Sequence, residues 1–238
     1  MNTLLFIILD RFQKKFLDVF KVLDDLLAII SPTNGDVTKL KNNVPNTLVT
    51  YSYFFGKCEN PNWLELLMKK GFFQDAPEPE QDEEGDIKFP PWPQAHYLAR
   101  MASLKPEVVV EVILQIPDTE NVMILEDFAE AALNMPPDFA ARLLEKGKIW
   151  ARSPYFSRLQ EKLGMLVAHL ARGDKADEAL ELARVLLEIL PDPAAEEAFK
   201  RGTNYDSPEP RARFETWEYE RILKEYFPEL LKAAETRA

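Results

Sequence analysis

The spacing of apolar residues predicts that the chain begins with a long helix. Over residues 3–30, apolar side chains recur alternately four and three residues apart, which places them on one stripe of a helix. They are Leu5, Leu9, Phe12, Phe16, Val19, Leu23, Leu26 and Ile30. Further apolar residues widen this stripe, so we expect a helix buried against several neighbours. One strand of an exposed coiled coil is the alternative.

Turn signals divide the next part of the chain. The cluster 31–36 ends the first helix. Residues 48–55 are rich in aromatic and β-branched side chains, as strands are, but no second strand lies nearby to pair with them, so a short helix is expected. Asn60 is expected to cap a helix that begins at Trp63, and Gly71 to close it.

Residues 75–91 interrupt the helical pattern. Seven of the twelve residues from Asp75 to Asp86 are acidic and none is basic, and four prolines stand in the segment. Such a composition buries too little apolar surface to order itself, so we predict a solvated, mobile loop without regular structure. The loop separates an N-terminal helical cap (1–74) from a helical-repeat body (92–238). The alternative is an acidic segment that attracts a basic partner.

From residue 94 onward, helices alternate with short proline or glycine breaks. Helices are expected over 94–103, 106–116, 120–134, 139–150, 155–171, 175–190, 194–200 and 211–234. Asp118 or Thr119 is the expected N-cap of the third. Connections of about three to six residues make consecutive helices antiparallel neighbours. The expected fold is therefore all-α, with antiparallel helical hairpins stacked as a short α-solenoid or an irregular helical bundle.

One hairpin carries a recognisable spacing of packing residues, namely Leu163, Gly164, Val167, Ala176, Leu180 and Ala183. In this spacing it resembles a tetratricopeptide repeat, in which small residues such as Gly164 and Ala176 let the two helices approach closely. It departs from that family in three ways. The early tryptophan is missing, Val167 replaces a tyrosine, and Pro191 comes about three residues late.

A broader region, residues 60–190, is similar in style to helical-repeat regions of large, poorly characterised bacterial proteins, some of them linked to antiviral defence. The similarity is carried by Asn60-Pro61-x-Trp63-Leu64, Trp92-Pro93-x-x-His96-Tyr97-Leu98, Thr119-x-Asn121-Val122 and Asn134-Met135-Pro136. It implies that the chain is a short stand-alone relative or a fragment of such a protein. It implies no catalytic residues.

Composition narrows the possible partners. The formal net charge of −11 opposes binding to nucleic acid and to anionic membranes. With Cys58 as the only cysteine, no disulfide can form within the chain. The apolar run Leu4–Leu9 is too short for a signal sequence or a membrane span, and no other run approaches eighteen residues. We expect a cytoplasmic protein that does not enter membranes.

The residues that carry enzyme chemistry are scarce. One cysteine and two histidines, far apart in sequence, do not make a structural zinc site. Neither a phosphate-binding glycine loop nor a nucleophile elbow is present. Cys58 follows Lys57, which lowers a thiol pKa in some proteins, but it has no histidine nearby in sequence. We expect no catalytic residues, no metal and no cofactor.

Protein binding is therefore the favoured function, as a scaffold or adaptor built from helical hairpins. If the stack has a concave surface, Arg142, Lys146, Arg152, Tyr155 and Arg158 are the expected partner-binding residues, because arginine and tyrosine are enriched at interfaces. The same basic and aromatic segment, 142–162, is the one place that resembles a nucleic-acid surface. The alternative function is an acidic subunit that sequesters a basic or nucleic-acid-binding protein.

Overall fold

The fold is known from a computed structural model, which describes residues 16–155, 158–188, 193–203 and 216–237. Residues 16–27 are helical. The elements that follow are α2 (Asn34–Asn43), α3 (Leu48–Lys57), the 3-10 turn η1 (Pro61–Trp63), α4 (Leu64–Lys69), β1 (Glu80–Gln81), β2 (Ile87–Lys88), α5 (Pro93–Met101), α6 (Pro106–Gln115), α7 (Val122–Asn134), α8 (Pro137–Ala141), α9 (Leu144–Ala151), α10 (Gln160–Arg172), α11 (Ala176–Leu186), α12 (Pro193–Arg201), α13 (Thr216–Glu225) and α14 (Phe227–Arg237). The expected all-α class is confirmed.

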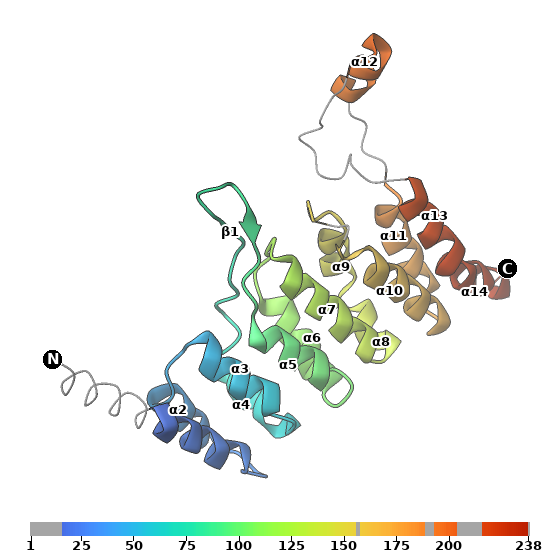
Figure 1. The fold of residues 1–238 in the computed structure, drawn as a ribbon. Coiled ribbons are helices and arrows are strands. Elements are labelled where there is room, and N and C mark those ends of the chain that lie inside the picture. Colours follow the sequence, from blue (N-terminus) through green and yellow to red (C-terminus); the bar gives the residue numbers. More distant parts are fainter. Residues whose placement is uncertain (1–15, 156–157, 189–192, 204–215, 238) are drawn as a thin grey trace.

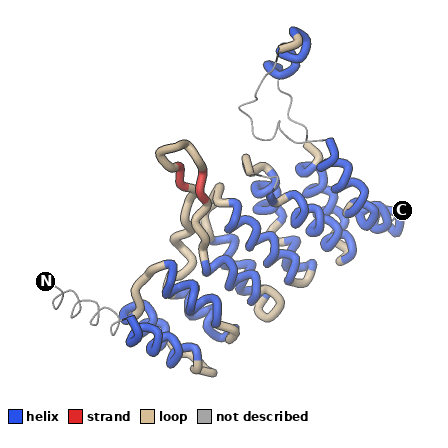
Figure 2. The backbone as a smooth tube through the Cα atoms, in the orientation of Figure 1, coloured by secondary structure: helices blue, strands red, loops and turns tan. Residues whose placement is uncertain are grey.

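The helices stack in two layers (Figures 1 and 2). In the first layer α3 packs against α5, α5 against α7, α7 against α10, and α10 against α14. In the second layer α2 packs against α4, α4 against α6, α6 against α8, and α9 against α11. Each hairpin thus contacts the hairpins before and after it, which is the arrangement of an α-solenoid. The packing continues across residues 75–91, because α3 and α4 contact α5 and α6.

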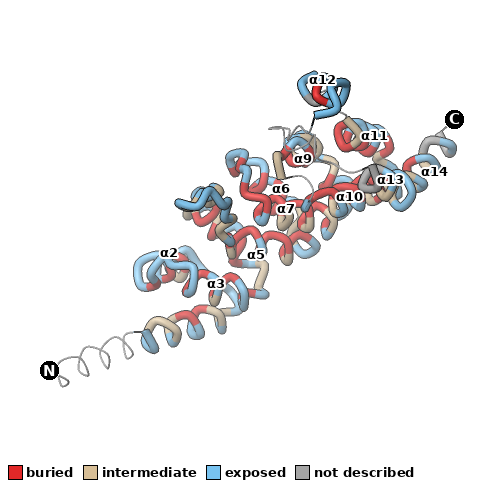
Figure 3. Tube along the Cα trace, turned by 45° about the horizontal axis from the view of Figure 1, so that its top comes forward, coloured by how far each residue is buried: buried red, intermediate tan, exposed pale blue. Residues whose placement is uncertain are grey.

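One hydrophobic core lies between the two layers. Buried residues follow one another along the stack (Figure 3), and they form a single cluster from Leu23 to Leu230. Its largest members are aromatic: the Trp63 ring meets Phe54 edge to face at 5.3 Å, and Phe55 lies 5.5 Å from Tyr97. Edge-to-face pairs add to the stability gained from burial alone. Wide apolar stripes such as these are expected where a helix has neighbours on two sides.

The first helix is held mainly by its second half. Residues 1–15, where Leu5, Leu9 and Phe12 of the predicted stripe stand, lie outside the described part. Of the rest, Leu23 and Leu26 are fully buried, whereas Phe16 is 54% and Ile30 83% exposed. Ile30 leaves the stripe because the helix ends before it. Asn60 Nδ2 donates hydrogen bonds to the carbonyl oxygens of Ile29 (3.0 Å) and Ile30 (2.8 Å).

Several predicted boundaries are wrong in an instructive way. The helix expected over 139–150 is two helices, α8 and α9, and the one expected from residue 155 begins at Gln160. Neither Asp118 nor Thr119 caps α7, because the N-cap is Asn121, whose side chain accepts a hydrogen bond from Met123 N (3.2 Å). Gly71 closes α4 as expected, with a left-handed φ of 77°. Asn60 accepts a hydrogen bond from Asn62 N, but the element that it caps is the 3-10 turn η1, and the N-cap of α4 is Trp63.

Residues 75–91 are not a loop without regular structure. They form a small antiparallel hairpin in which Glu80 pairs with Lys88 and Gln81 with Ile87. Asp82 builds the turn by accepting hydrogen bonds from the backbone N–H groups of Glu84 (3.1 Å) and Asp86 (2.9 Å). The composition suggested that apolar burial was the only route to order. Local hydrogen bonds of an aspartate side chain supply another.

Gly164 has a different neighbour from the one the repeat-like spacing predicted. It was expected to let α10 and α11 approach closely. The nearest side chain is instead that of Tyr226, between α13 and α14, and a Cβ atom at Gly164 would lie 2.3 Å from Tyr226 Cδ2. The glycine therefore admits the C-terminal helices, and α10 contacts both α11 and α14.

Among the described residues, no helix combines the length and apolar character needed to cross a membrane.

Candidate functional site

The broadest candidate surface is the outer side of the first layer. Four helices lie side by side there, and we call their outward surface the α3–α10 face. It presents Ser52 from α3, His96 from α5, Met123, Glu126 and Asp127 from α7, and Lys162 and Met165 from α10. Because all four of these helices contribute, the face is a product of the stacking and of no single segment.

A hollow of about 340 Å³ lies in this face. It is lined by Ser52, Gly56, Pro91, Trp92, Pro93, His96, Met123, Glu126, Asp127 and Lys162. Its polar feature is a pair formed by His96 Nδ1 and Asp127 Oδ1, 3.4 Å apart, with the histidine exposed and the aspartate half-buried. Burial raises the pKa of Asp127, while the hydrogen bond and charge of His96 act in the opposite direction. The pair joins α5 to α7 across the hollow.

The cations of the face are paired with carboxylates of α7. Arg158 Nε and Nη2 reach the two carboxylate oxygens of Glu126 at 3.3 and 3.4 Å. Lys162 Nζ lies 3.0 Å from Glu130 Oε2 and donates to the Glu126 carbonyl oxygen at 3.3 Å. These contacts fix α10 against α7 and leave the surface mixed in charge.

A second hollow, of about 590 Å³, follows along the same layer toward the C-terminal helices. Its lining is Glu130, Leu133, Asn134, Met165, His169, Arg172, Glu225 and Tyr226. His169 Nε2 lies 2.9 Å from the Met135 carbonyl oxygen, which holds the imidazole against the end of α7. Glu126 lines the first hollow and Glu130 the second, and these residues are one helical turn apart, so the two hollows follow one another along α7.

The five residues predicted to bind a partner do not form one patch. Lys146 Nζ donates to the Ile116 carbonyl oxygen (2.7 Å) and to Asp118 Oδ1 (2.6 Å), and therefore ties α9 to the end of α6. Arg152 Nε lies 3.5 Å from Glu188 Oε2. Arg142 is exposed after α8 and has no ion pair within the described ranges.

Tyr155 packs against the acidic hairpin formed by residues 75–91. Its ring meets Phe89 edge to face at 4.7 Å, and its N–H donates to Ser153 Oγ (3.2 Å). Tyr155 thereby connects the end of the α9 segment to the acidic hairpin, whereas Arg158 contacts Glu126 of α7. The basic segment therefore serves contacts inside the molecule, which its sequence alone does not reveal.

The sequence did not predict the residue that attaches the acidic hairpin to α7. Asn121 is fully buried, and its Nδ2 donates to the carbonyl oxygens of Pro77 (2.9 Å) and Pro90 (2.8 Å). These two prolines stand on the two arms of the hairpin. The same side chain caps α7, so one residue fixes a helix and clamps the base of the acidic hairpin. The only sequence signal was an asparagine directly before an apolar helix.

The hairpin carries carboxylates toward solvent. Asp82 pairs with Lys88 (3.0 Å), and Glu78 Oε2 accepts from Thr119 Oγ1 (3.0 Å). The remaining acids of the segment, Asp75, Glu80, Glu83, Glu84 and Asp86, have no ion pair within the part of the chain that the structure describes. Beside its base lies a hollow of about 520 Å³ whose lining includes Glu78, Asp118 and Glu120.

Of the residues weighed for enzyme chemistry, His96 and His169 line the two hollows of the α3–α10 face, and Cys58 lines neither. Cys58 is buried, and burial raises the pKa of its thiol, so the reactive thiolate is disfavoured at neutral pH. Over the described ranges, no three His, Cys, Asp or Glu side chains come together as metal ligands would.

Comparison with known proteins returns no match to a family model, a curated protein or a solved structure.

Proposed function

We propose that this protein is a non-enzymatic scaffold or adaptor that binds another protein through the α3–α10 face. The observation that carries the proposal is the continuous outer surface of the first layer, with two hollows in line and exposed methionines beside them. Met123 is 36% and Met165 42% exposed, and methionine adapts to varied apolar contacts. A stack of hairpins offers such an extended surface without any catalytic group.

The mixed charge of the face favours a protein partner over nucleic acid. Arg158 and Lys162 are matched by Glu126 and Glu130, so no cationic strip remains to follow a phosphate backbone. The similarity to helical-repeat regions of bacterial defence proteins leads us to place the chain in a larger bacterial defence or regulatory complex. Its lone cysteine suits the reducing cytoplasm, where we propose that it works.

Affinity co-purification from the native host, compared between two double variants, tests the face. Met123→Glu with Met165→Glu puts charge on the α3–α10 face. Leu114→Glu with Leu180→Glu is the matched control, because these leucines are each 41% exposed but lie on α6 and α11 of the other layer. A stoichiometric protein should be retained by the control and lost by the face variant. Equal loss from both variants, or no stoichiometric protein with the wild type, contradicts the proposal.

The second candidate function is an acidic subunit that sequesters a basic or nucleic-acid-binding protein. The observation that favours it is the ordered acidic hairpin, whose base Asn121 clamps and whose outer carboxylates are unpaired in the described part. Neutralising Glu80, Glu83, Glu84 and Asp86 to their amides should then release the partner, as should high salt. Under the first proposal the same change leaves binding intact.

A further inference from the structure

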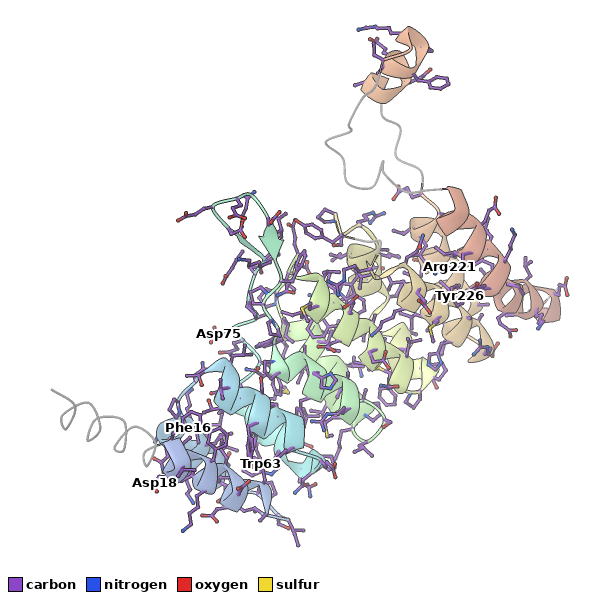
Figure 4. The ribbon with its side chains drawn as sticks, in the orientation of Figure 1. Phe16, Asp18, Trp63, Asp75, Arg221 and Tyr226 are labelled. Carbon is purple, nitrogen blue, oxygen red and sulfur yellow. The ribbon has the colours of Figure 1, made fainter. Side chains whose placement is uncertain are left out.

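A cavity of about 260 Å³ lies where the first hairpins meet the base of the β1–β2 hairpin, and it shares Pro91, Trp92 and Pro93 with the lining of the 340 Å³ hollow. It is lined by Lys41, Asn46, Thr47, Leu48, Tyr51, Lys70, Gly71, Phe72, Asp75, Pro77, Pro91, Trp92, Pro93 and Gln94. Its walls come from four separate stretches of chain, at residues 41, 46–51, 70–77 and 91–94. The labelled Asp75 marks its edge in Figure 4, where the chain leaves α4 for the hairpin. Its size suits a small organic molecule better than a single ion.

One part of the lining favours negative charge. Lys41 and Lys70 both line the cavity, and neither has an ion pair among the residues that the structure describes. Lys41 Nζ donates to the Lys70 carbonyl oxygen at 3.3 Å, which brings the first ammonium group beside the second residue. The cavity also meets the first residues of α3 and α5, and helix N-termini attract anions.

Another part of the lining requires hydrogen-bond donors. Gln94 is only 6% exposed, and its Nε2 donates to the Phe72 carbonyl oxygen (3.4 Å). Its Oε1 is buried and has no partner within the described chain. An unsatisfied buried acceptor costs about 1–3 kcal/mol, which a ligand donor would recover. The Asp75 carboxylate lines the same cavity and has no ion pair in the described ranges.

The remaining wall is aromatic. Tyr51, Phe72 and Trp92 all line the cavity while being largely buried in the core. The rings of Tyr51 and Phe72 are stacked, with centroids 5.9 Å apart and planes inclined by 27°. Rings held in this way offer a rigid apolar surface to a ligand side chain.

From these three parts we infer that the cavity binds a free α-amino acid with an apolar side chain. The carboxylate lies toward Lys41, Lys70 and the helix starts. The ammonium group donates to Asp75 and to Gln94 Oε1, and the side chain packs on the aromatic wall. Inorganic phosphate would use the cationic part alone and leave Gln94 without a donor. The inference stands apart from the proposed scaffold function, because its polar contacts come from residues that line neither hollow of the α3–α10 face, namely Lys41, Lys70, Asp75 and Gln94.

Calorimetric titration of the full chain tests the inference, with two amino acids and with two analogues of phenylalanine that each lack one charged group. The probes are phenylalanine, leucine, 3-phenylpropionate, which lacks the ammonium group, and phenethylamine, which lacks the carboxylate. At least one of the two amino acids should bind saturably. Phenylalanine, if it binds, should do so at least about tenfold more tightly than either truncated compound, a difference of about 1.4 kcal/mol. Binding by neither amino acid, or equal affinity for 3-phenylpropionate, overturns the inference.

Variants at the rim separate specific binding from general charge attraction. Lys41→Gln with Lys70→Gln should weaken amino-acid binding at least tenfold. Lys39→Gln with Lys69→Gln removes the same charge from exposed lysines next to the site in sequence but outside its lining, and should bind as the wild type does. Asp75→Asn should weaken amino-acid binding as well. Equal losses in the two lysine pairs overturn the inference.

Discussion

The ring of Tyr226 lies so close to the backbone of Gly164 that any side chain at position 164 would force the ring to move. A Cβ atom there would approach Tyr226 Cδ2 to 2.3 Å and Cε2 to 2.8 Å. Tyr226 is the residue between α13 and α14, and α14 packs along α10. This one contact therefore sets how closely the C-terminal helices approach the stack.

Replacing Gly164 by alanine should destabilise the protein by about 1–3 kcal/mol, the usual range for overpacking. Urea unfolding measures the change, and hydrogen exchange should show faster exchange in α13 and α14. Gly147→Ala is the matched control within a helix, because its Cβ would meet Leu182 Cδ1 at an ordinary 3.6 Å. The control should be neutral or stabilising by up to about 1 kcal/mol. Equal unfolding midpoints for both variants would contradict the assigned contact.

Asn121→Ala should cost about 2–4 kcal/mol, because it removes the cap of α7 and both hydrogen bonds to the hairpin arms. Amides of residues 75–91 should exchange faster with solvent. Asn121→Asp separates the two roles, since it keeps the capping acceptor but loses both donated bonds. It should loosen the hairpin with a smaller effect on α7. Unchanged exchange in the hairpin of either variant would refute the clamp.

Asp127→Asn should stabilise the protein at neutral pH. Burial raises the pKa of Asp127 in the folded state, so the charged form is disfavoured there relative to the unfolded chain. The resulting penalty applies at pH above the raised pKa, falls as the pH falls through it, and is gone below the unfolded value of 3.8. The difference in free energy of unfolding between the variant and the wild type should therefore become smaller as the pH falls. Chemical unfolding from pH 7 to pH 3.5 measures it, and a constant difference would count against this account.

Tyr53→Phe should destabilise the protein by about 0.5–1.5 kcal/mol. The Tyr53 hydroxyl donates to Asp24 Oδ1 (2.6 Å) and accepts from Lys57 Nζ (2.8 Å), which links the first helix to α3. The ring contact with Phe20, 4.7 Å between centroids, is retained in the variant. Tyr155→Phe is the control, because the ring of Tyr155 packs on Phe89 and only its backbone takes part in an assigned hydrogen bond. Thermal unfolding measures both variants. If Tyr155→Phe lost as much stability as Tyr53→Phe, the stabilising role of the Tyr53 hydroxyl would be contradicted.

Apolar spacing and proline breaks are local signals, and they predicted most of the helices from residue 94 onward. They did not predict α2 or the division of 139–150 into α8 and α9. They also failed where one residue acts across the fold. Asn121 looked like an ordinary polar residue before a helix. Its side chain nevertheless donates to Pro77 and Pro90, two residues of the acidic hairpin that stand more than thirty positions earlier in the chain. Gly164 matched a family spacing, but its neighbour lies about sixty residues further along the chain.

The candidate site was harder to foresee for the same reason. Arg158 and Lys146 are cations in a basic segment, and the sequence could not show that Glu126 and Asp118 neutralise them. Conversely, His96 and Asp127 are ordinary residues on separate helices until stacking places them 3.4 Å apart. Charge pairing depends on which helices become neighbours, and no local pattern records that.

The double duty of Asn121 has a mechanical consequence. The hairpin arms are bonded to the same side chain that holds the first turn of α7. A force on the hairpin is therefore transmitted through the Asn121 side chain to the first turn of α7.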